Sequence, residues 1–230
     1  GLYANGAATP CGERAGTEKL FEWQNKYDER IYTAALKYNI PARLLKGLLA
    51  QESQFWPRSG SPYELGLGMY TERGADMLLT WNVSYYLSNC IPTYGTIACS
   101  AGYSHLDPEA QTMMRRSVID KIGTDSEIDV LAATLLASAA QVDRMLFNTA
   151  RAEPSQLTDY ETMWKITTGN YYAGSGCTGT ALERIDAGGL KLTWEQLVTQ
   201  MDESCRVASR YVENIFSTAF DAELLASDGR

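Results

Sequence analysis

The chain has 230 residues, of which 45% are hydrophobic, and it carries a formal charge of −8. This length and hydrophobic content are sufficient for one domain with a substantial core. The negative charge and the absence of a Lys/Arg cluster argue against nucleic-acid binding, because the phosphate backbone would be repelled. No apolar run approaches the roughly 20 residues that span a bilayer, so no transmembrane segment is expected.

The chain is expected to consist of a tail, one domain and a second tail. Residues 1–16 are rich in Gly, Ala and Pro and are expected to be a tail or linker. Residues 17–220 carry the periodic apolar pattern without an internal repeat, which predicts a single domain. Residues 221–230 are expected to be a frayed C-terminal tail. The start at Gly1, without a signal-peptide pattern, favours a mature segment or a piece of a larger polypeptide.

The first two helices are predicted from caps, prolines and apolar spacing. Thr17 is expected to cap a helix that runs to Tyr38, because apolar residues recur along it at near-helical spacing. A second helix is expected between Pro41 and Pro57. Pro41 suits a first helical turn, whereas Pro57 prevents much continuation.

Glu52 is the leading catalytic candidate. Leu45, Leu48 and Glu52 fall at i, i+3 and i+7, so this carboxyl group shares the stripe of leucines that faces the core. It also lies close to the negative end of the helix dipole. Burial and the dipole both disfavour the charged form and raise the pKa, as a general acid near neutral pH requires.

The remaining elements are also predicted to be helical. A glycine-bearing loop at 64–71 precedes them, with at most a small hairpin around 60–70. The expected helices run from Thr71 through Tyr85, from Asp107 to the Gly123 turn, from Ile128 to about Thr149, over 158–169, and from Thr193 to about Phe220. The fold class is therefore predicted to be all-α.

The five cysteines predict two disulfides. Cys90 and Cys99 flank a loop that contains Pro and Gly, which a short-range disulfide could close. Cys177 follows a glycine-rich turn and Cys205 is expected in a later helix, so these two could join loop to helix. Cys11 is left unpaired or pairs outside this segment. The alternative is five reduced, buried thiols in a cytoplasmic protein, but an oxidising compartment is preferred. No metal site or cofactor is expected, since there is no CxxC pair and a single histidine, His105.

Three motifs in this order resemble the lytic transglycosylases, lysozyme-like enzymes that cleave the glycan strands of peptidoglycan. The family has a catalytic Glu followed by Ser, then a Gly-Leu-Met-Gln loop, then a Tyr-Asn-Ala-Gly turn. The corresponding residues here are Glu52-Ser53, Gly66-Leu67-Gly68-Met69 and Tyr171-Tyr172-Ala173-Gly174. The resemblance is best over 38–86 and 164–176.

The chain departs from this pattern at three positions. Gly68 stands in place of Met, Met69 in place of Gln, and Tyr172 in place of Asn. The family's Gln helps to hold the substrate, so a thioether at this position loses a donor and an acceptor. The resemblance implies that Tyr171 lies near the catalytic Glu and orients it. The substrate-binding residues that it implies are Ser53, Gly66, Leu67, Met69, Tyr70, Tyr171 and Tyr172.

The resemblance implies a mechanism with a single carboxyl group. Glu52 would protonate the glycosidic oxygen and then, as a carboxylate, accept the proton of the muramic acid 6-hydroxyl, which closes to a 1,6-anhydro product. Most glycosidases use two carboxylates instead. Glu64 and Asp76 are the nearest candidates for a second one if the protein is a hydrolysing lysozyme.

The resemblance also implies partners and a location. Peptidoglycan glycan strands would be the substrate, in the periplasm, the cell wall or the secreted fraction. The alternative is a non-catalytic lysozyme-like module that binds glycan or serves as a structural part of a larger envelope or extracellular assembly.

Overall fold

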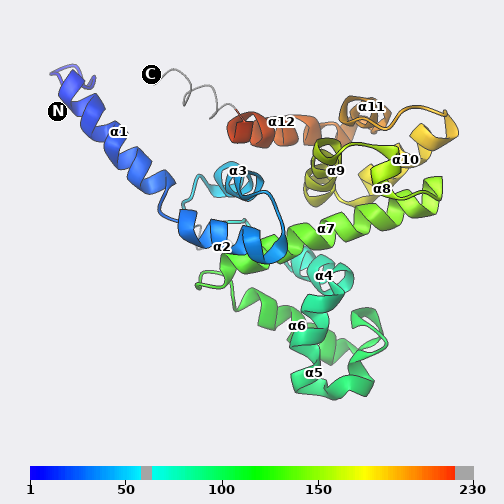
Figure 1. Cartoon of the computed structure of the whole chain (residues 1–230). Helices are drawn as coiled ribbons and strands as arrows, with labels where there is room; N and C mark the ends of the chain where they lie inside the picture. The colour runs from blue at the N-terminus through cyan, green and yellow to red at the C-terminus, as the bar shows by residue number, and fades with distance from the viewer. Residues whose placement is uncertain (58–63, 221–230) are drawn as a thin grey trace.

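The computed structural model describes residues 1–57 and 64–220, with the side chains of 218–220 excepted, and it is all-α as predicted (Figure 1). No β-strand occurs in these two ranges. The helices are α1 (Pro10–Gln24), α2 (Asp28–Tyr38), α3 (Ala42–Ser53), α4 (Glu72–Trp81), α5 (Val83–Cys99), η1 (Tyr103–His105), α6 (Pro108–Ile119), α7 (Glu127–Ala150), α8 (Pro154–Leu157), α9 (Tyr160–Ala173), α10 (Ser175–Ala187), α11 (Trp194–Gln200), η2 (Glu203–Cys205) and α12 (Val207–Phe220).

Helix α7 runs through the middle of the molecule and separates two hydrophobic clusters. Figure 1 shows α3, α9 and α12 on one side of α7 and α4, α5 and α6 on the other. Leu131 and Leu135 of α7 belong to the first cluster, whereas Val130, Ala133 and Ala137 belong to the second. Because residues on both faces of α7 are buried, this helix is the shared core of the protein.

Its length and composition also make α7 the one helix in the described part of the chain that could cross a membrane. However, 56% of its most apolar window is buried inside the protein. The apolar character of α7 is accounted for by its position between the two clusters, in agreement with the expectation of no transmembrane segment.

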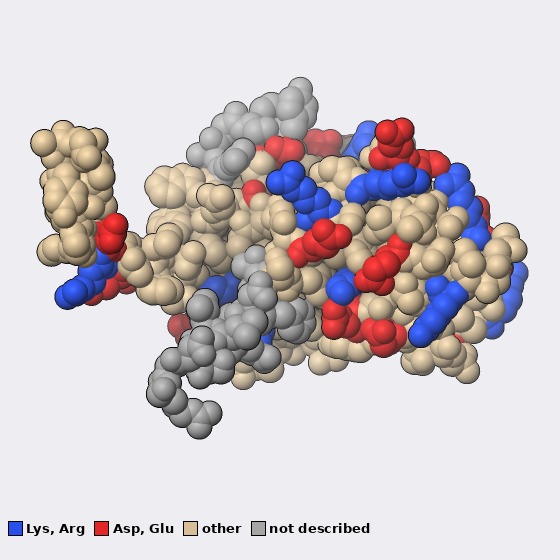
Figure 2. Space-filling model, turned by 90° about the horizontal axis from the view of Figure 1, so that it is seen from above, with Lys and Arg blue, Asp and Glu red and all other residues tan. Residues whose placement is uncertain are grey.

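The N-terminal residues differ from the predicted tail. Helix α1 begins at Pro10, inside 1–16, because Pro10 occupies the first turn and the Thr9 hydroxyl caps it by accepting from Gly12 N at 3.1 Å. Thr17, the predicted cap, lies within α1 and donates to Glu13 O. No residue of α1 is buried, and the helix projects away from the rest of the molecule (Figures 1 and 2).

The predicted helix from Thr17 to Tyr38 is two helices. The chain leaves helical geometry at Asn25, and α2 starts at Asp28. The apolar spacing continues across this break, so periodicity could not reveal it. The packed body of the protein begins here, because Trp23 packs against the core and Tyr27 is buried in it.

Other boundaries also shift. The helix predicted from Thr71 is capped by Thr71 as expected, but it ends at Trp81, where Asn82 caps α5. The predicted loop between Cys90 and Cys99 is helical, with a kink at Gly95 (φ 81°). A single left-handed glycine thus turns the chain while the flanking residues remain helical.

The C-terminal half contains more helices than predicted. Helix α9 continues past Gly169 to Ala173, and Gly174 at φ 83° ends it. Helix α10 replaces the predicted glycine-rich turn. The helix predicted from Thr193 to Phe220 is divided by η2 into α11 and α12. The predicted tail 221–230 lies outside the described residues.

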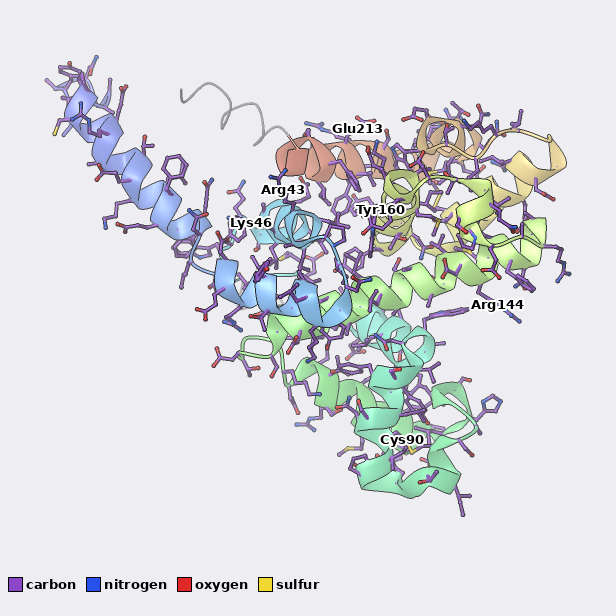
Figure 3. All side chains as sticks on the ribbon, in the orientation of Figure 1. Arg43, Lys46, Cys90, Arg144, Tyr160 and Glu213 are labelled. Atoms are coloured by element: carbon purple, nitrogen blue, oxygen red, sulfur yellow. A yellow bond between two sulfur atoms is a disulfide. The ribbon has the colours of Figure 1, made fainter. Side chains whose placement is uncertain are left out.

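Both predicted disulfides are present. Cys90–Cys99 closes the kinked α5 within the α4–α6 half, where Figure 3 labels Cys90. Cys177–Cys205 joins α10 to η2. Cys11 is exposed and unpaired on α1. The positions of the cysteines within helices differ from the prediction, but the pairs are the predicted ones.

Candidate functional site

Helix α3 places Glu52 at the edge of the core. Leu45, Leu48 and Leu49 are fully buried, and this packing fixes the rotation of the helix about its axis. Glu52 is in the last turn and is partly buried. Gln54 and Phe55 follow with φ of 53° and 61°, so the chain turns away sharply and leaves Glu52 at the end of the helix.

The Glu52 carboxyl group is paired with a tyrosine from the far end of the chain. Tyr211 of α12 donates its hydroxyl to Glu52 Oε1. Burial raises the pKa of Glu52 to about 7, against the opposing effect of the Tyr211 hydrogen bond and with a further raise from the negative charge of Glu64. Close to pH 7, Glu52 is therefore protonated in about half of the molecules, which suits a group that gives and then takes a proton.

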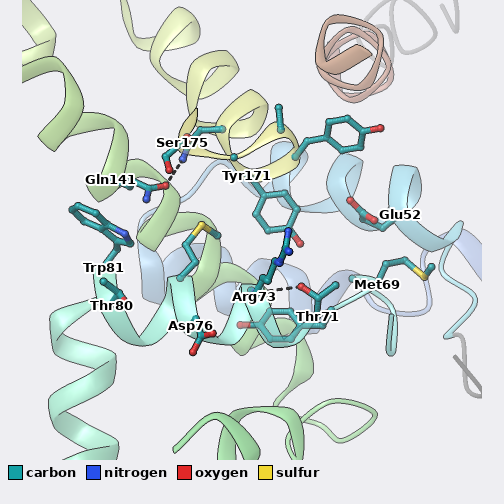
Figure 4. Close-up of a pocket in the computed structure, with 18 of the residues that line it drawn as sticks. Glu52, Met69, Thr71, Arg73, Asp76, Thr80, Trp81, Gln141, Tyr171 and Ser175 are labelled. Carbon is teal, nitrogen blue, oxygen red and sulfur yellow. Dashed lines mark hydrogen bonds between the residues drawn. The ribbon is translucent and has the colours of Figure 1, made fainter. Parts of the chain in front are cut away.

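Glu52 lines a cleft of about 600 Å³ (Figure 4). The walls come from the glycine loop (residues 64–71), α4, α7 and the end of α9. The polar side chains of the lining, apart from the aromatic ones, are Glu52, Glu64, Thr71, Arg73, Asp76, Thr80, Gln141, Asn170 and Ser175. This volume is within the range of about 300–1,000 Å³ that small-molecule sites in proteins occupy.

A buried carboxyl group holds the glycine loop in place. Glu127, at the start of α7, accepts hydrogen bonds from Leu67 N and from Gly123 N. Gly66 has φ 71°, and a Cβ at this position would overlap the Glu127 carboxyl group. Burial raises the pKa of Glu127, and the backbone N–H groups that bind it act in the opposite direction. Glycine is therefore required at position 66 for two separate reasons.

The loop also closes on itself. Leu65 and Tyr70 exchange backbone hydrogen bonds of 3.0 and 2.8 Å, a single antiparallel bridge within the hairpin predicted around 60–70. Residues 60–63 of that hairpin lie outside the described residues. Met69 at φ 48° forms the turn. The bridge and Glu127 together fix the loop that forms one wall of the cleft.

The structure brings together four of the seven residues predicted to bind substrate. Met69, Tyr70, Tyr171 and Tyr172 line the cleft with Glu52. The buried hydroxyl of Tyr70 pairs with Thr134 Oγ1 at 2.8 Å, so Tyr70 contributes mainly its ring to the wall.

The other three residues support the site from behind. Ser53 is buried, and its hydroxyl donates to Leu49 O in its own helix at 3.2 Å. Gly66 and Leu67 are buried at the attachment to Glu127. These positions are not part of the lining of the cleft, because their polar groups and backbone face the protein interior.

The two tyrosines of the third motif have different positions. Tyr171 is partly buried in the cleft wall, and burial, with the charge of Glu52, raises its pKa well above the usual value of 10. Tyr172 is exposed and stacks on Tyr211, with ring centroids 4.2 Å apart. The resemblance assigned the orienting role to Tyr171, whereas the hydroxyl bonded to Glu52 is that of Tyr211.

Tyr211 and Glu127 were not found from the sequence. Tyr211 is 159 residues from Glu52, and in α12 it follows the same apolar spacing as its core neighbours Val212 and Ile215. Glu127 follows a Gly-Thr-Asp-Ser segment that reads as a helix start. An acidic residue is common in the first turn of a helix, so Glu127 looks ordinary in the sequence. The neighbouring residues do not indicate that its carboxyl group binds a loop 60 residues earlier in the chain.

The two candidate second carboxylates line the cleft in different states. Asp76 accepts from Tyr103 Oη at 2.6 Å and pairs with Arg115 at 3.3 Å, so both of its oxygens are engaged in the α4–α6 half. Glu64 is exposed in the glycine loop and acts on Glu52 through its charge. Glu52 combines partial burial with a pKa that is raised to about 7.

Within residues 1–57 and 64–220, no group of three or more His, Cys, Asp or Glu side chains is arranged to hold a metal ion. Comparisons of the chain with protein-family models, with curated proteins and with solved structures found no match.

Proposed function

We propose that this protein is a lytic transglycosylase that cleaves the β-1,4 bond between MurNAc and GlcNAc in peptidoglycan. The observation that carries the proposal is the cleft-lining carboxyl group of Glu52, whose pKa burial raises to about 7. The order of the three sequence motifs supports the same assignment, as does the all-α fold. The proposal includes a lysozyme-like arrangement of these helices.

In the proposed reaction, Glu52 acts first as acid and then as base. Its proton passes to the glycosidic oxygen as that bond breaks. The resulting carboxylate, stabilised by the Tyr211 hydroxyl, accepts the proton of the C6 hydroxyl as this oxygen attacks the anomeric carbon. The product is a 1,6-anhydro sugar, and Glu52 is protonated again. No cofactor enters the scheme.

The surroundings of Glu52 support a one-carboxylate scheme. Asp76, a candidate nucleophile or base, is paired with Arg115 and bonded to Tyr103. With one oxygen bonded to Tyr103 and the other paired with Arg115, Asp76 is held in the α4–α6 half by contacts within the protein. The two disulfides support the proposed location outside the cytoplasm, where thiols are oxidised.

Digestion of purified peptidoglycan tests the proposal. Mass spectrometry should detect anhydro-muropeptides with the unaltered protein. Their rate of formation should fall by at least about 100-fold in Glu52→Gln, which removes the general acid. Glu64→Gln is the matched control, since Glu64 lines the same cleft, and it should retain activity.

The other outcomes distinguish the alternatives. Products with reducing ends, abolished by Glu64→Gln or Asp76→Asn as well, would identify a two-carboxylate hydrolase. Binding of peptidoglycan without any product would favour the non-catalytic glycan-binding module. That alternative draws on Met69 and Tyr172, which replace polar family residues in the cleft lining.

A further inference from the structure

The end of the cleft away from Glu52 contains a second group of side chains. Figure 4 shows Trp81, Gln141 and Ser175 at this end and Glu52 with Met69 at the other. None of the three belongs to the predicted site. Trp81 and Gln141 are partly buried and come from α4 and α7, so the two helices that meet there contribute one side chain each.

A buried hydrogen-bond network fixes the orientation of the Gln141 amide. The Ser138 hydroxyl donates its only proton to Thr167 O at 2.8 Å, so it must accept from Asn170 Nδ2, 3.0 Å away. The second proton of Asn170 Nδ2 goes to Gln141 Oε1 at 2.9 Å. Gln141 Oε1 is thus occupied, and its Nε2 has no acceptor in the described part of the chain. Gln141 therefore presents an N–H donor to the cleft, and not a carbonyl acceptor.

This orientation has a cost in the interior. Asn170 is fully buried, and its Oδ1 has no hydrogen-bond partner among the described residues. The amide cannot be reversed to relieve this, because Ser138 has no proton left to donate. A buried, unsatisfied carbonyl is unfavourable for stability and rare in proteins. The network is therefore better explained by the donor it presents than by the stability it provides.

We infer that Gln141 is a specificity-determining residue that donates Nε2–H to the acetamido carbonyl oxygen of an N-acetylated sugar, with Asn170 as its positioning residue. The inference rests on the proposed function, since both sugars of peptidoglycan carry this group. An amide carbonyl is a strong neutral acceptor, and the neighbouring Trp81 ring offers an apolar surface for the acetamido methyl group.

Calorimetric binding of two neutral tetrasaccharides tests the inference. Chitotetraose carries an acetamido group on each sugar, and cellotetraose carries a hydroxyl at the same carbon. The protein used carries Glu52→Gln, so that neither probe is cleaved. Chitotetraose should bind at least tenfold more tightly than cellotetraose.

The informative variant is Gln141→Glu. Its carboxylate can still accept from Asn170 but has no proton to donate, so chitotetraose affinity should fall about tenfold while cellotetraose affinity is unchanged. Gln200→Glu is the matched control, because Gln200 is partly exposed, lies outside the cleft and receives the same charge. It should bind both sugars like the parent.

The positioning role is tested by Asn170→Ser, which releases the Gln141 amide. The ratio of the two affinities should then approach that of Gln141→Glu, whereas a loss of folding would abolish both affinities together. In protein with native Gln141, the side-chain amide signals of this residue should shift in NMR spectra on addition of chitotetraose, independently of any variant's stability.

Three results would overturn the inference: equal binding of the two sugars, equal effects of Gln141→Glu and Gln200→Glu, or Gln141 signals that chitotetraose does not move. None of these bears on the peptidoglycan digest. If the protein releases anhydro-muropeptides but gives any of these three results, the proposed activity stands and the specificity assigned to Gln141 does not. A protein that prefers chitotetraose but forms no product would lose the activity alone.

Discussion

Glu52 occupies a position where its charged form is disfavoured. Burial raises its pKa from 4.5 to about 7, even though the Tyr211 hydroxyl stabilises the carboxylate. In the unfolded chain the group returns to its ordinary pKa. Between pH 4.5 and pH 7, the folded state therefore binds more protons than the unfolded state. The contribution of Glu52 to folding is most favourable below pH 4.5 and is lost as the pH rises through 7.

This linkage predicts the effect of Glu52→Gln on stability. The neutral amide removes the cost of burying the charge, so the variant should be more stable than the parent at pH 8, by on the order of 3 kcal/mol. The difference should shrink toward pH 5. Urea unfolding at the two pH values measures it. A variant that is equally or less stable at pH 8 would show that the carboxylate is well solvated.

The sequence could predict Glu52 because the relevant signal is local. The leucine spacing in α3 places its side chain on the core-facing stripe, and the prolines at 41 and 57 limit the helix. Tyr211 could not be predicted in this way. Its pairing with Glu52 depends on how α12 docks on α3, and the α12 pattern reads as ordinary core packing.

At the scale of elements, the glycine loop owes its shape to the start of α7. Glu127 binds the loop through Leu67 N, and Gly66 leaves room for its carboxyl group. The attachment joins the loop to the central helix of the protein. This wall of the cleft is thus fixed to a helix that is buried on both faces.

Substitution of Gly66 tests this attachment. Gly66→Ala combines the backbone strain of a positive φ with a collision between Cβ and Glu127, so it should destabilise the fold by about 3 kcal/mol or more. Gly102→Ala is the matched control. Gly102 has φ 93° with open space around its Cβ position, so only the backbone strain of about 1–3 kcal/mol should appear, without a collision.

Hydrogen exchange locates the effect of Gly66→Ala. Amides of residues 65–70 should exchange faster in this variant than in Gly102→Ala, because the loop loses its attachment. Equal loss of stability in the two variants would mean that Glu127 does not determine the conformation of the loop.

Element boundaries show where sequence patterns fail. Thr71 and Asp107 were predicted to cap helices, and both do. Each side chain accepts a hydrogen bond from the backbone N–H three residues later, so the signal lies within a few residues of sequence. The break at Asn25 and the division of the last helix by η2 were missed, because the apolar spacing continues through both. The kink at Gly95 was mistaken for a loop because Pro92 and Gly95 both disfavour regular helix.

At the scale of the molecule, α1 lies outside the packed body. None of its residues is buried, and its contact with the core is confined to its last turn, where Trp23 Nε1 donates to Gln54 O at 3.1 Å and the Trp23 ring packs against Trp56. Acidic and basic side chains are interspersed over the face shown in Figure 2. In the described part of the chain, residues 1–22 contribute no buried side chain.

Removal of residues 1–22 should therefore leave the free energy of unfolding within about 0.5 kcal/mol of the parent value. Trp23→Ala in the full chain is the contrasting variant and should cost about 1–3 kcal/mol, since it removes the buried part of the ring. Urea denaturation of both measures the difference. A large loss on truncation would mean that α1 contributes to the fold in solution.

The all-α class was predictable because no segment alternates with period two. The arrangement of the helices around α7 was not, since it depends on contacts between residues far apart in the chain. Cys90, Cys99 and Cys177 were predicted to flank a loop or a turn and lie in helices instead, whereas Cys205 was predicted in a long helix and lies in η2. The Cys90–Cys99 pair could be predicted because the two cysteines are close in the sequence. Cys177 and Cys205 were then the two cysteines that remained in the C-terminal half of the chain.

The cleft is lined by residues from both sides of α7. Glu52 stands on α3, which packs in one hydrophobic cluster, and Trp81 on α4, which packs in the other. A ligand long enough to contact both ends of the cleft would bind residues from both clusters at once. Because such a ligand binds only the folded arrangement, it would raise the melting temperature of the protein.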